Sequence, residues 1–173
     1  MVDITLQKNI GALIDVKSVL APAYPWTAGG PSDSVTFTSS SIDREGLSTG
    51  SLPRTADVDV FYSATLGAGA TLSLYLEVDS APDNATWTPY AIEASTVIAT
   101  GPAGGGTVSG VYRMTVPSSD NFENTPSIDL NGAQRFLRVL GVPHLSRTGT
   151  DTAVIQAIGL VLAGFDQLAA PQA

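Results

Sequence analysis

Hydrophobic and polar residues alternate along much of this chain, most regularly over residues 71–79. Leu72, Leu74 and Leu76 fall on one side of an extended backbone, and polar residues fall on the other. A period of two residues is typical of a β-strand with one face in a hydrophobic core and the other towards solvent. The pattern therefore predicts a half-buried strand over this segment.

Further segments share this β-like composition, and glycine- and proline-rich turns separate them. The expected strands are residues 34–40, 57–64, 71–79, 87–93, 110–116, 136–142 and 152–163. No segment keeps the helical period over a useful length. Short strands with such connections favour an all-β fold, an antiparallel β-sandwich of the jelly-roll type, rather than a parallel sheet.

The last expected strand has two different faces. Counting by twos places Val154, Ile158, Leu160 and Leu162 together on one side. The opposite side is then a smooth surface of small residues, interrupted by Ile155 and Val161. Small side chains allow another sheet or another chain to approach closely, so this strand is a candidate for core packing or for a subunit contact.

Residues 1–30 differ from the rest of the chain. Pro22 and Pro25 disfavour regular structure there. The same segment holds many apolar side chains, including Tyr24 and Trp26, and so much apolar surface is not left in water. We therefore expect an extended N-terminal arm that lies on its own domain or on a neighbouring subunit.

The composition fits one domain with a real hydrophobic core, because the chain has 173 residues of which 43% are hydrophobic. The expected organisation is the arm (1–30), a β-sandwich domain (31–164) and a C-terminal tail (165–173). The cysteine count is 0, so neither a disulfide nor a thiolate metal site can form. Stability must come from packing or assembly.

The chain is acidic, with a net charge of −8 and only 8 Lys and Arg. This balance opposes binding to phosphate backbones, so we expect no nucleic-acid partner. The N-terminus lacks the basic region of a signal peptide, and the longest apolar run, residues 153–163, falls short of the about 20 residues that a membrane-spanning helix needs. We therefore expect no membrane partner either.

Candidate catalytic and metal-binding groups are few. The chain has 1 histidine, His144, which lies at a strand-to-loop exit without a Gly-x-Ser-x-Gly elbow, and a surface or subunit-contact histidine is the favoured interpretation. Asp57 with Asp59, and Asp79 with Asp83, could contribute to a calcium site, but no Asp-x-Asp-x-Asp-Gly loop supports one. We expect no cofactor and no enzyme activity.

The polar side of the strand at 71–79 has the residue types of a sugar platform. Aromatic faces stack on sugars and carboxylates accept their hydroxyl hydrogens, so Tyr75 and Glu77 are candidates, with Trp87 as a tempting addition. Trp87, however, directly follows a turn, where a tryptophan more often serves as a core plug or loop anchor.

Arg138 shares a strand face with Phe136 and Leu140, and a charge among apolar neighbours needs a partner. Either a carboxylate from an adjacent strand pairs with Arg138, or this face meets another subunit. Phe122, in the polar loop at 117–126, could anchor that loop or contact a partner.

Taken together, several segments resemble a known group of proteins. These are the runs TLSLYLEVDS at 71–80, DNATW at 83–87 and QRFLRV at 134–139, and the small-apolar strand at 152–163. Their order and spacing are similar to those of tailed-phage virion proteins, namely capsid cement or decoration proteins, including the jelly-roll type of podophage heads. The resemblance covers residues 58–164, and the long N-terminal portion departs from it.

The resemblance implies a non-enzymatic structural protein of a bacteriophage virion. Such proteins cluster as trimers on the outside of the head and bridge neighbouring subunits of the major capsid protein, so the expected location is the capsid surface after synthesis in the host cytoplasm. It carries over no binding motif, and Tyr24, Trp26, Phe122 and Arg138 are our interface expectations. The alternative is a carbohydrate-binding β-sandwich of a phage tail or fibre, and a hydrolase ranks third.

Overall fold

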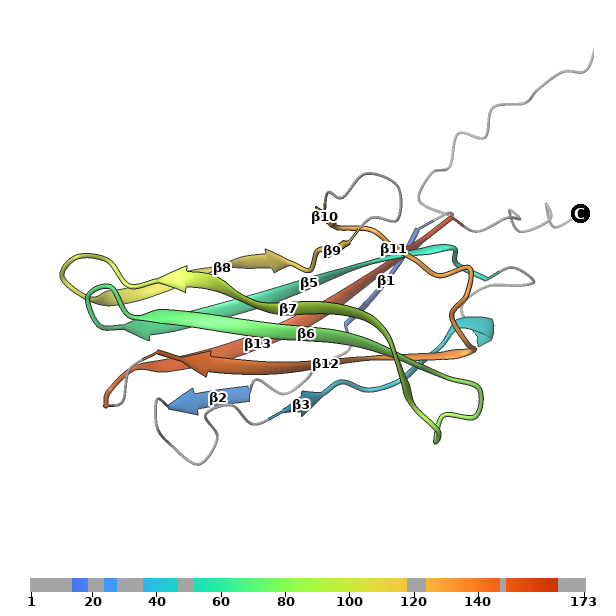
Figure 1. Cartoon of the computed structure of the whole chain (residues 1–173), viewed down its shortest axis with the longest axis horizontal. Coiled ribbons are helices and arrows are strands. Elements are labelled where there is room, and N and C mark those ends of the chain that lie inside the picture. Colours follow the sequence, from blue (N-terminus) through green and yellow to red (C-terminus); the bar gives the residue numbers. More distant parts are fainter. Residues whose placement is uncertain are drawn as a thin grey trace, which may run out of the picture.

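The computed structural model describes residues 14–18, 24–27, 36–46, 52–117, 124–146 and 149–164, which form two antiparallel β-sheets packed face to face (Figure 1). Apart from one 3-10 turn, η2 (Arg44–Gly46), every described element is a strand. Across these residues no helix is long and apolar enough to span a membrane.

Sheet A is built around two long neighbouring strands, β5 (Thr55–Leu66) and β13 (Thr152–Ala163). Shorter strands complete its edges. Beside β13 lie β1 (Ile14–Ser18) and β2 (Tyr24–Thr27), and beside β5 lie β8 (Gly106–Arg113) and β11 (Ile128–Asp129).

Sheet B is built around β6 (Thr71–Ala81) and β12 (Phe136–Leu145). Its edges are again different strands. Beside β6 lies β7 (Thr88–Thr100), and beside β12 lie β3 (Phe37–Thr38) and β4 (Ile42–Asp43). A separate small ribbon pairs β9 (Val116–Pro117) with β10 (Asn124–Thr125).

The order of the main strands is that of a jelly roll. We take β1 with β2 and β3 with β4, because each pair shares one edge, and leave aside the two-residue strands β9 to β11. The main strands then run first, eighth, third, sixth across sheet A and second, seventh, fourth, fifth across sheet B. The chain thus wraps from sheet to sheet in two interlocked Greek keys, and the predicted fold class is confirmed.

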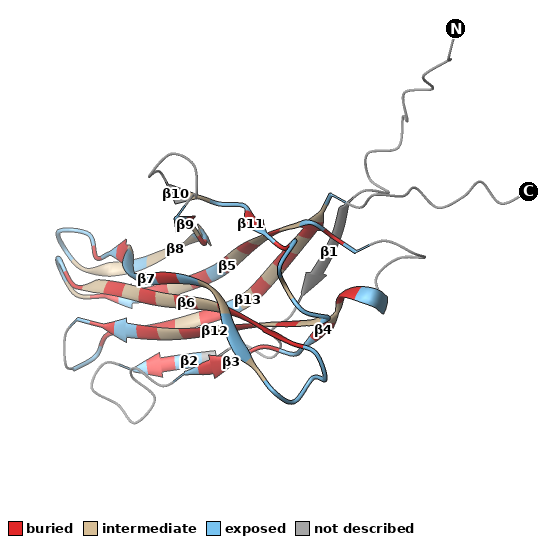
Figure 2. Cartoon of the chain, turned by 45° about the vertical axis from the view of Figure 1, so that its right-hand side comes forward, coloured by how far each residue is buried: buried red, intermediate tan, exposed pale blue. Residues whose placement is uncertain are grey.

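The alternation that predicted the strands places their apolar residues in the core. Leu72, Leu74 and Leu76 of β6 and Val58 and Val60 of β5 are 0% exposed. Buried and partly exposed residues follow each other in regular stripes along β6 and β12 (Figure 2). The outward positions hold charged, hydroxyl and aromatic side chains together with several aliphatic ones, and these form the two outer faces of the sandwich.

The last strand breaks the alternation, and our assignment of its faces was wrong for three positions, Ala153, Val154 and Ile155, because Ala153 also faces the core. A β-bulge lies between Ile155 and Ala157, where Gln156 is exposed. One extra residue resets a two-residue period, so Ile155 faces the core with Ile158, whereas Val154 is only partly buried. Counting every second residue along the sequence cannot predict where such a bulge lies.

Two strands lie within the segment that we expected to be an irregular arm. β1 pairs with the second half of β13, and β2 pairs with its first half. Pro25 of β2 lies opposite Val154 of β13. This is the edge of the sheet, where a residue without an N–H is tolerated. The described part of the arm therefore belongs to sheet A, and Pro25 does not exclude a strand there.

Tyrosine hydroxyls tie the edge strand β7 of sheet B to sheet A. The Tyr62 hydroxyl of β5 donates to the carbonyl of Ile98 at 2.9 Å, and the Tyr90 hydroxyl of β7 donates to the carbonyl of Asp129 in β11 at 2.6 Å. Gly110 makes room for the first of these, because a Cβ there would lie 2.9 Å from the Tyr62 hydroxyl oxygen.

A buried carboxylate makes a third connection at the same edge. Glu93 of β7 is 6% exposed and accepts hydrogen bonds from the Tyr112 hydroxyl of β8 and from both the N–H and the hydroxyl of Thr115. Burial, and then the bond to Glu93, raise the pKa of Tyr112 to about 12. The sandwich is therefore closed along β7 by polar bonds as well as by apolar packing.

Arg44 closes the sandwich where η2 meets the loop before β12. It is 2% exposed, and its guanidinium donates to the carbonyls of Ala133, Gln134, Pro53 and Leu130. Burial lowers the pKa of Arg44, and the four carbonyls replace the lost water around Nη1 and Nη2, whereas the buried Nε has no hydrogen-bond partner. One side chain thus fixes three separate stretches of chain.

Candidate interaction surfaces

The described residues give no arrangement typical of catalysis. His144 is exposed on the outer face of sheet B, opposite Ser73 in the register. No three His, Asp or Glu side chains among the described residues are grouped to hold a metal ion. Many of the described charged side chains are instead paired with each other or bonded to the backbone or to hydroxyl groups, so we turn to the two outer faces.

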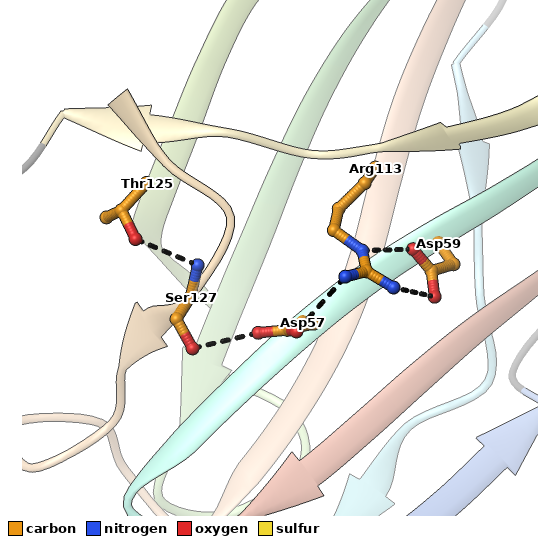
Figure 3. A network of polar contacts seen from close by, with 5 residues as sticks. All are labelled: Asp57, Asp59, Arg113, Thr125 and Ser127. Carbon is orange, nitrogen blue, oxygen red and sulfur yellow. Dashed lines mark hydrogen bonds and ion pairs between the residues drawn. The ribbon is translucent and has the colours of Figure 1, made fainter. Parts of the chain in front are cut away.

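On the outer face of sheet A an arginine lies between two aspartates (Figure 3). Arg113 of β8 binds Asp59 of β5 through Nε at 2.7 Å and Nη2 at 3.1 Å, and its Nη1 lies 3.9 Å from Asp57. Ser127 donates to Asp57 at 2.9 Å. Asp59 raises the pKa of Arg113, which stays charged.

Beside this network lies an exposed apolar pair. Phe61 of β5 is directly opposite Val111 of β8, and the two side chains are 41% and 55% exposed. On the other side Phe61 is opposite Ala157 of β13. An apolar row therefore crosses sheet A next to the charged row of Asp59 and Arg113.

The outer face of sheet B holds Arg138 and its partner. Its Nη2 and Nε lie 2.8 and 2.9 Å from Oδ2 of Asp79, the residue directly opposite on β6. Its guanidinium also lies 4.4 Å from the centre of the Trp87 ring. The first of the two alternatives for Arg138, a carboxylate from an adjacent strand, is thus present.

Two further side chains extend this cluster along β6. Tyr75 donates its hydroxyl hydrogen to Oε2 of Glu77, which raises the pKa of Tyr75 to about 12. Burial, and then the neighbouring carboxylate of Asp79, raise the pKa of Glu77. One guanidinium therefore stands beside two carboxylates, and it is bonded to Asp79.

The sugar-platform and calcium candidates are arranged differently from what those roles need. One face of Trp87 is occupied by Arg138, so the indole is an anchor for the arginine. Asp79 is 3% exposed and bonded to Arg138, whereas Asp83 caps its own turn by accepting the N–H groups of Ala85 and Thr86, which lowers the pKa of Asp83. These carboxylates do not converge.

The expected interface residues fall in different places. Trp26 is 3% exposed and packs against Phe37, with ring centroids 5.8 Å apart, so it belongs to the core of its own chain. Tyr24 lies in β2 opposite Ile155, and nothing is described of its side chain. Phe122 lies outside the described residues. Arg138 is on a partly exposed face, with 26% of its side chain accessible.

Comparison with known proteins gives distant matches to solved structures. No protein-family model and no curated protein matches the chain. Among solved structures, a chain of the infectious bursal disease virus Gx strain aligns over 88% of this chain with 9% identity and a TM-score of 0.45, and this chain covers 32% of that one.

Two other solved structures are comparable. A mutant VP2 protein of infectious bursal disease virus aligns over 87% of this chain and 32% of its own, with 12% identity and a TM-score of 0.40. A chain of the cowpea mosaic virus top component aligns over 91% and 94%, with 10% identity and a TM-score of 0.24. This chain spans about a third of the bursal disease virus chains. Likeness this distant carries no argument about function.

Sequence reasoning missed the exposed apolar residues of both faces. On sheet A these are Phe61 and Val111, and on sheet B they are Ile92 and Val97, which are 46% and 52% exposed. The signal for Phe61 was present, because alternation places it on the same side as Asp57 and Asp59. The signal for Val97 was not, because register shifts in the β6–β7 pair hide the period of β7.

Proposed function

We propose that this protein is a non-enzymatic structural component of a tailed-phage particle, a decoration protein that binds the outside of the capsid. It stabilises the particle by bridging neighbouring subunits of the major capsid protein, and it acts as a trimer. It reaches the capsid surface after synthesis in the host cytoplasm.

The observation that carries this proposal is the exposure of large apolar side chains on both outer faces of the sandwich. Several charged groups join strands or loops to one another, as Arg44, Glu93 and Arg138 do, while large apolar side chains stay exposed on both outer faces. A protein that works by contact needs a rigid body with such faces. The sequence resemblance to cement proteins supplies the identity of the partner, and additive burial at subunit junctions supplies the stabilisation.

The test is a binding and stability assay on particles of the source virus that lack this chain. Purified chain added back should bind the particles in a saturable manner and raise the temperature and lower the salt concentration at which they rupture. Cryo-electron microscopy of the restored particle should show added density at subunit junctions. If the added chain does not bind, or if particles without it resist heat and low salt equally well, the proposal fails.

The same preparation separates the carbohydrate-binding alternative. A glycan array probed with the purified chain should give no specific signal if the chain is a decoration protein. Specific binding that is lost on replacing Tyr75 or Trp87 would favour the alternative, because those two side chains carry the aromatic surface beside Glu77.

A further inference from the structure

Around Glu77 the charges of the outer face of sheet B do not balance. Glu77 and Asp79 lie two positions apart on the same face of β6, and Arg138 is the cation that faces them from β12. Both bonds of Arg138 go to the same oxygen, Oδ2 of Asp79. Glu77 and Asp79 together therefore carry one negative charge more than Arg138 neutralises, and that charge belongs to Glu77.

A buried acceptor marks the same place. Asp79 is 3% exposed, and its Oδ1 has no hydrogen-bond partner. Glu77 is the neighbouring carboxylate on the same face of β6, so two like charges lie side by side when Glu77 ionises. Ionised Glu77 keeps the Tyr75 hydroxyl and is attracted by Arg138, but Arg138 is bonded to Asp79, whose like charge opposes Glu77, and a further positive group would relieve this.

Apolar side chains surround Glu77. In the register of the sheet it lies between Ile92 of β7, which is 46% exposed, and Leu140 of β12, which is partly exposed. Tyr75, the neighbour along β6, lies opposite Val142. A polar centre inside an apolar rim resembles the anchor position of an interface, where one residue of the partner enters and its neighbours exclude water.

We propose that this surface, Tyr75, Glu77, Ile92, Leu140 and Val142, is a docking site for another protein, which places an arginine or lysine side chain on Glu77. The methylenes of that side chain pack on Ile92 and Leu140, and its charged end pairs with the carboxylate. The proposal deepens the proposed function by naming the surface and its chemistry, and it rests on that function in taking a capsid subunit as the partner.

Charge complementarity selects this occupant. An apolar partner would bury Glu77 without compensation, which costs free energy. The same face of a second copy would bring another Glu77 and Asp79 against the first pair, and each copy already carries a net charge of −8. A metal ion finds too few ligands, because the described residues include no group of three His, Asp or Glu around it.

The site is tested directly with a peptide probe. The full chain, labelled at its methyl groups, is titrated with the tripeptide acetyl-Leu-Arg-Leu-amide and, for comparison, with acetyl-Leu-Gln-Leu-amide, and NMR spectra are recorded. We expect the arginine peptide to shift the methyl signals of Ile92, Leu140 and Val142 and to bind at least about tenfold more tightly than the glutamine peptide, as a charge-assisted bond requires. Equal binding of the two peptides, or no shift with either, overturns the proposal.

Matched variants show whether the charge of Glu77 is responsible. Glu77→Gln keeps the size and a hydrogen-bonding oxygen, and it should remove the preference for the arginine peptide. Asp57→Asn makes the same charge change on the opposite face and should leave the preference unchanged. If Glu77→Gln binds the arginine peptide as the unaltered chain does, the site is not centred on Glu77.

The particle assay then separates this inference from the proposed function. The affinity for particles should fall at least about tenfold for Glu77→Gln, because loss of a desolvated charge pair costs more than 1.4 kcal/mol. It should fall by a similar factor for Ile92→Ser, because Ile92 excludes water from that pair. It should stay unchanged for Phe61→Ser, which lies on sheet A. If Phe61→Ser alone abolishes binding, the capsid contact is on sheet A, and the inference fails while the proposed function stands. If the unaltered chain does not bind particles, the proposed function fails, and the peptide titration still decides the site.

Discussion

Glu93 of β7 and Tyr112 of β8 are joined by a hydrogen bond, so a buried carboxylate of sheet B holds the edge strand of sheet A. The same carboxylate accepts the N–H and the hydroxyl of Thr115, which follows β8. Strands β7 and β8 are consecutive in the chain but belong to different sheets, and this contact fixes how the chain turns from one sheet to the other.

Removal of the Glu93 side chain should be costly. Glu93→Ala leaves the Tyr112 hydroxyl and both Thr115 donors without their acceptor, and we expect the free energy of unfolding to fall by about 2–4 kcal/mol. Tyr112→Phe removes one bond and should cost about 1 kcal/mol. Urea unfolding measures both. Ser63→Ala, which removes an exposed hydroxyl bonded to Ser109, is the control and should stay within about 0.5 kcal/mol.

Alkaline pH should weaken the fold through Tyr112. Its pKa is about 12 in the folded protein against 10.0 for the free side chain, so the unfolded chain loses the proton first. The stability that this group contributes is complete below pH 10 and is lost as the pH rises towards 12. Thermal unfolding at several pH values should show a smaller alkaline loss for Tyr112→Phe than for the unaltered chain. An equal loss for the variant and the unaltered chain would show that Tyr112 ionises as readily in the folded protein as in the unfolded chain.

Arg44 should be hard to replace. Arg44→Ala removes the donor of four carbonyls, and two of the lost hydrogen bonds are buried. We expect the free energy of unfolding to fall by about 3–5 kcal/mol. Arg44→Lys keeps the charge, but a compact ammonium cannot reach both pairs of carbonyls and should lose an intermediate amount. Arg113→Lys on the exposed face is the control with a small effect. A lysine variant as stable as the unaltered chain would contradict the role of the planar fork.

Replacement by alanine should affect two strand glycines differently, Gly141 of β12 and Gly159 of β13. A Cβ at Gly141 would lie 2.2 Å from Cζ of Phe37, which is 1% exposed and cannot move away. Gly141→Ala should therefore cost about 1–3 kcal/mol by overpacking. At Gly159 the nearest atom is Cε2 of Phe61 at 3.9 Å, so Gly159→Ala should be neutral within about 0.5 kcal/mol or slightly stabilising. Similar effects at both sites would contradict the described packing of Phe37.

Glu77 should reduce stability at neutral pH. Its pKa is raised in the folded protein, so at pH values above 4.5, the ordinary pKa of a glutamate, the folded chain holds more protons than the unfolded chain. The free energy of unfolding therefore falls as the pH rises through that window. Glu77→Gln should remove this decrease and raise the unfolding temperature at pH 7, and thermal unfolding between pH 4 and 8 measures it. A lower unfolding temperature for the variant would show that ionised Glu77 has a stabilising partner within the chain.

Sequence pattern was sufficient for the fold class because core formation imposes a local rule. Where a strand is straight, as β6 is at Leu72, Leu74 and Leu76, one face must be apolar, and the rule can be followed along the chain. The rule fails where backbone geometry changes without a change in composition. The bulge at Gln156 moved Ile155 into the core, and edge pairing made a strand of the segment around Pro25.

What the sequence by itself determined was therefore the all-β character, the identity of most core positions and the need of Arg138 for a partner. Tertiary structure decided which partner that is and which surface is left for other molecules. Asp79 meets Arg138 across 59 residues of chain, and Glu77 gains its apolar rim from β7 and β12. Such meetings depend on the register of strands that are distant in sequence, and no local period contains that information.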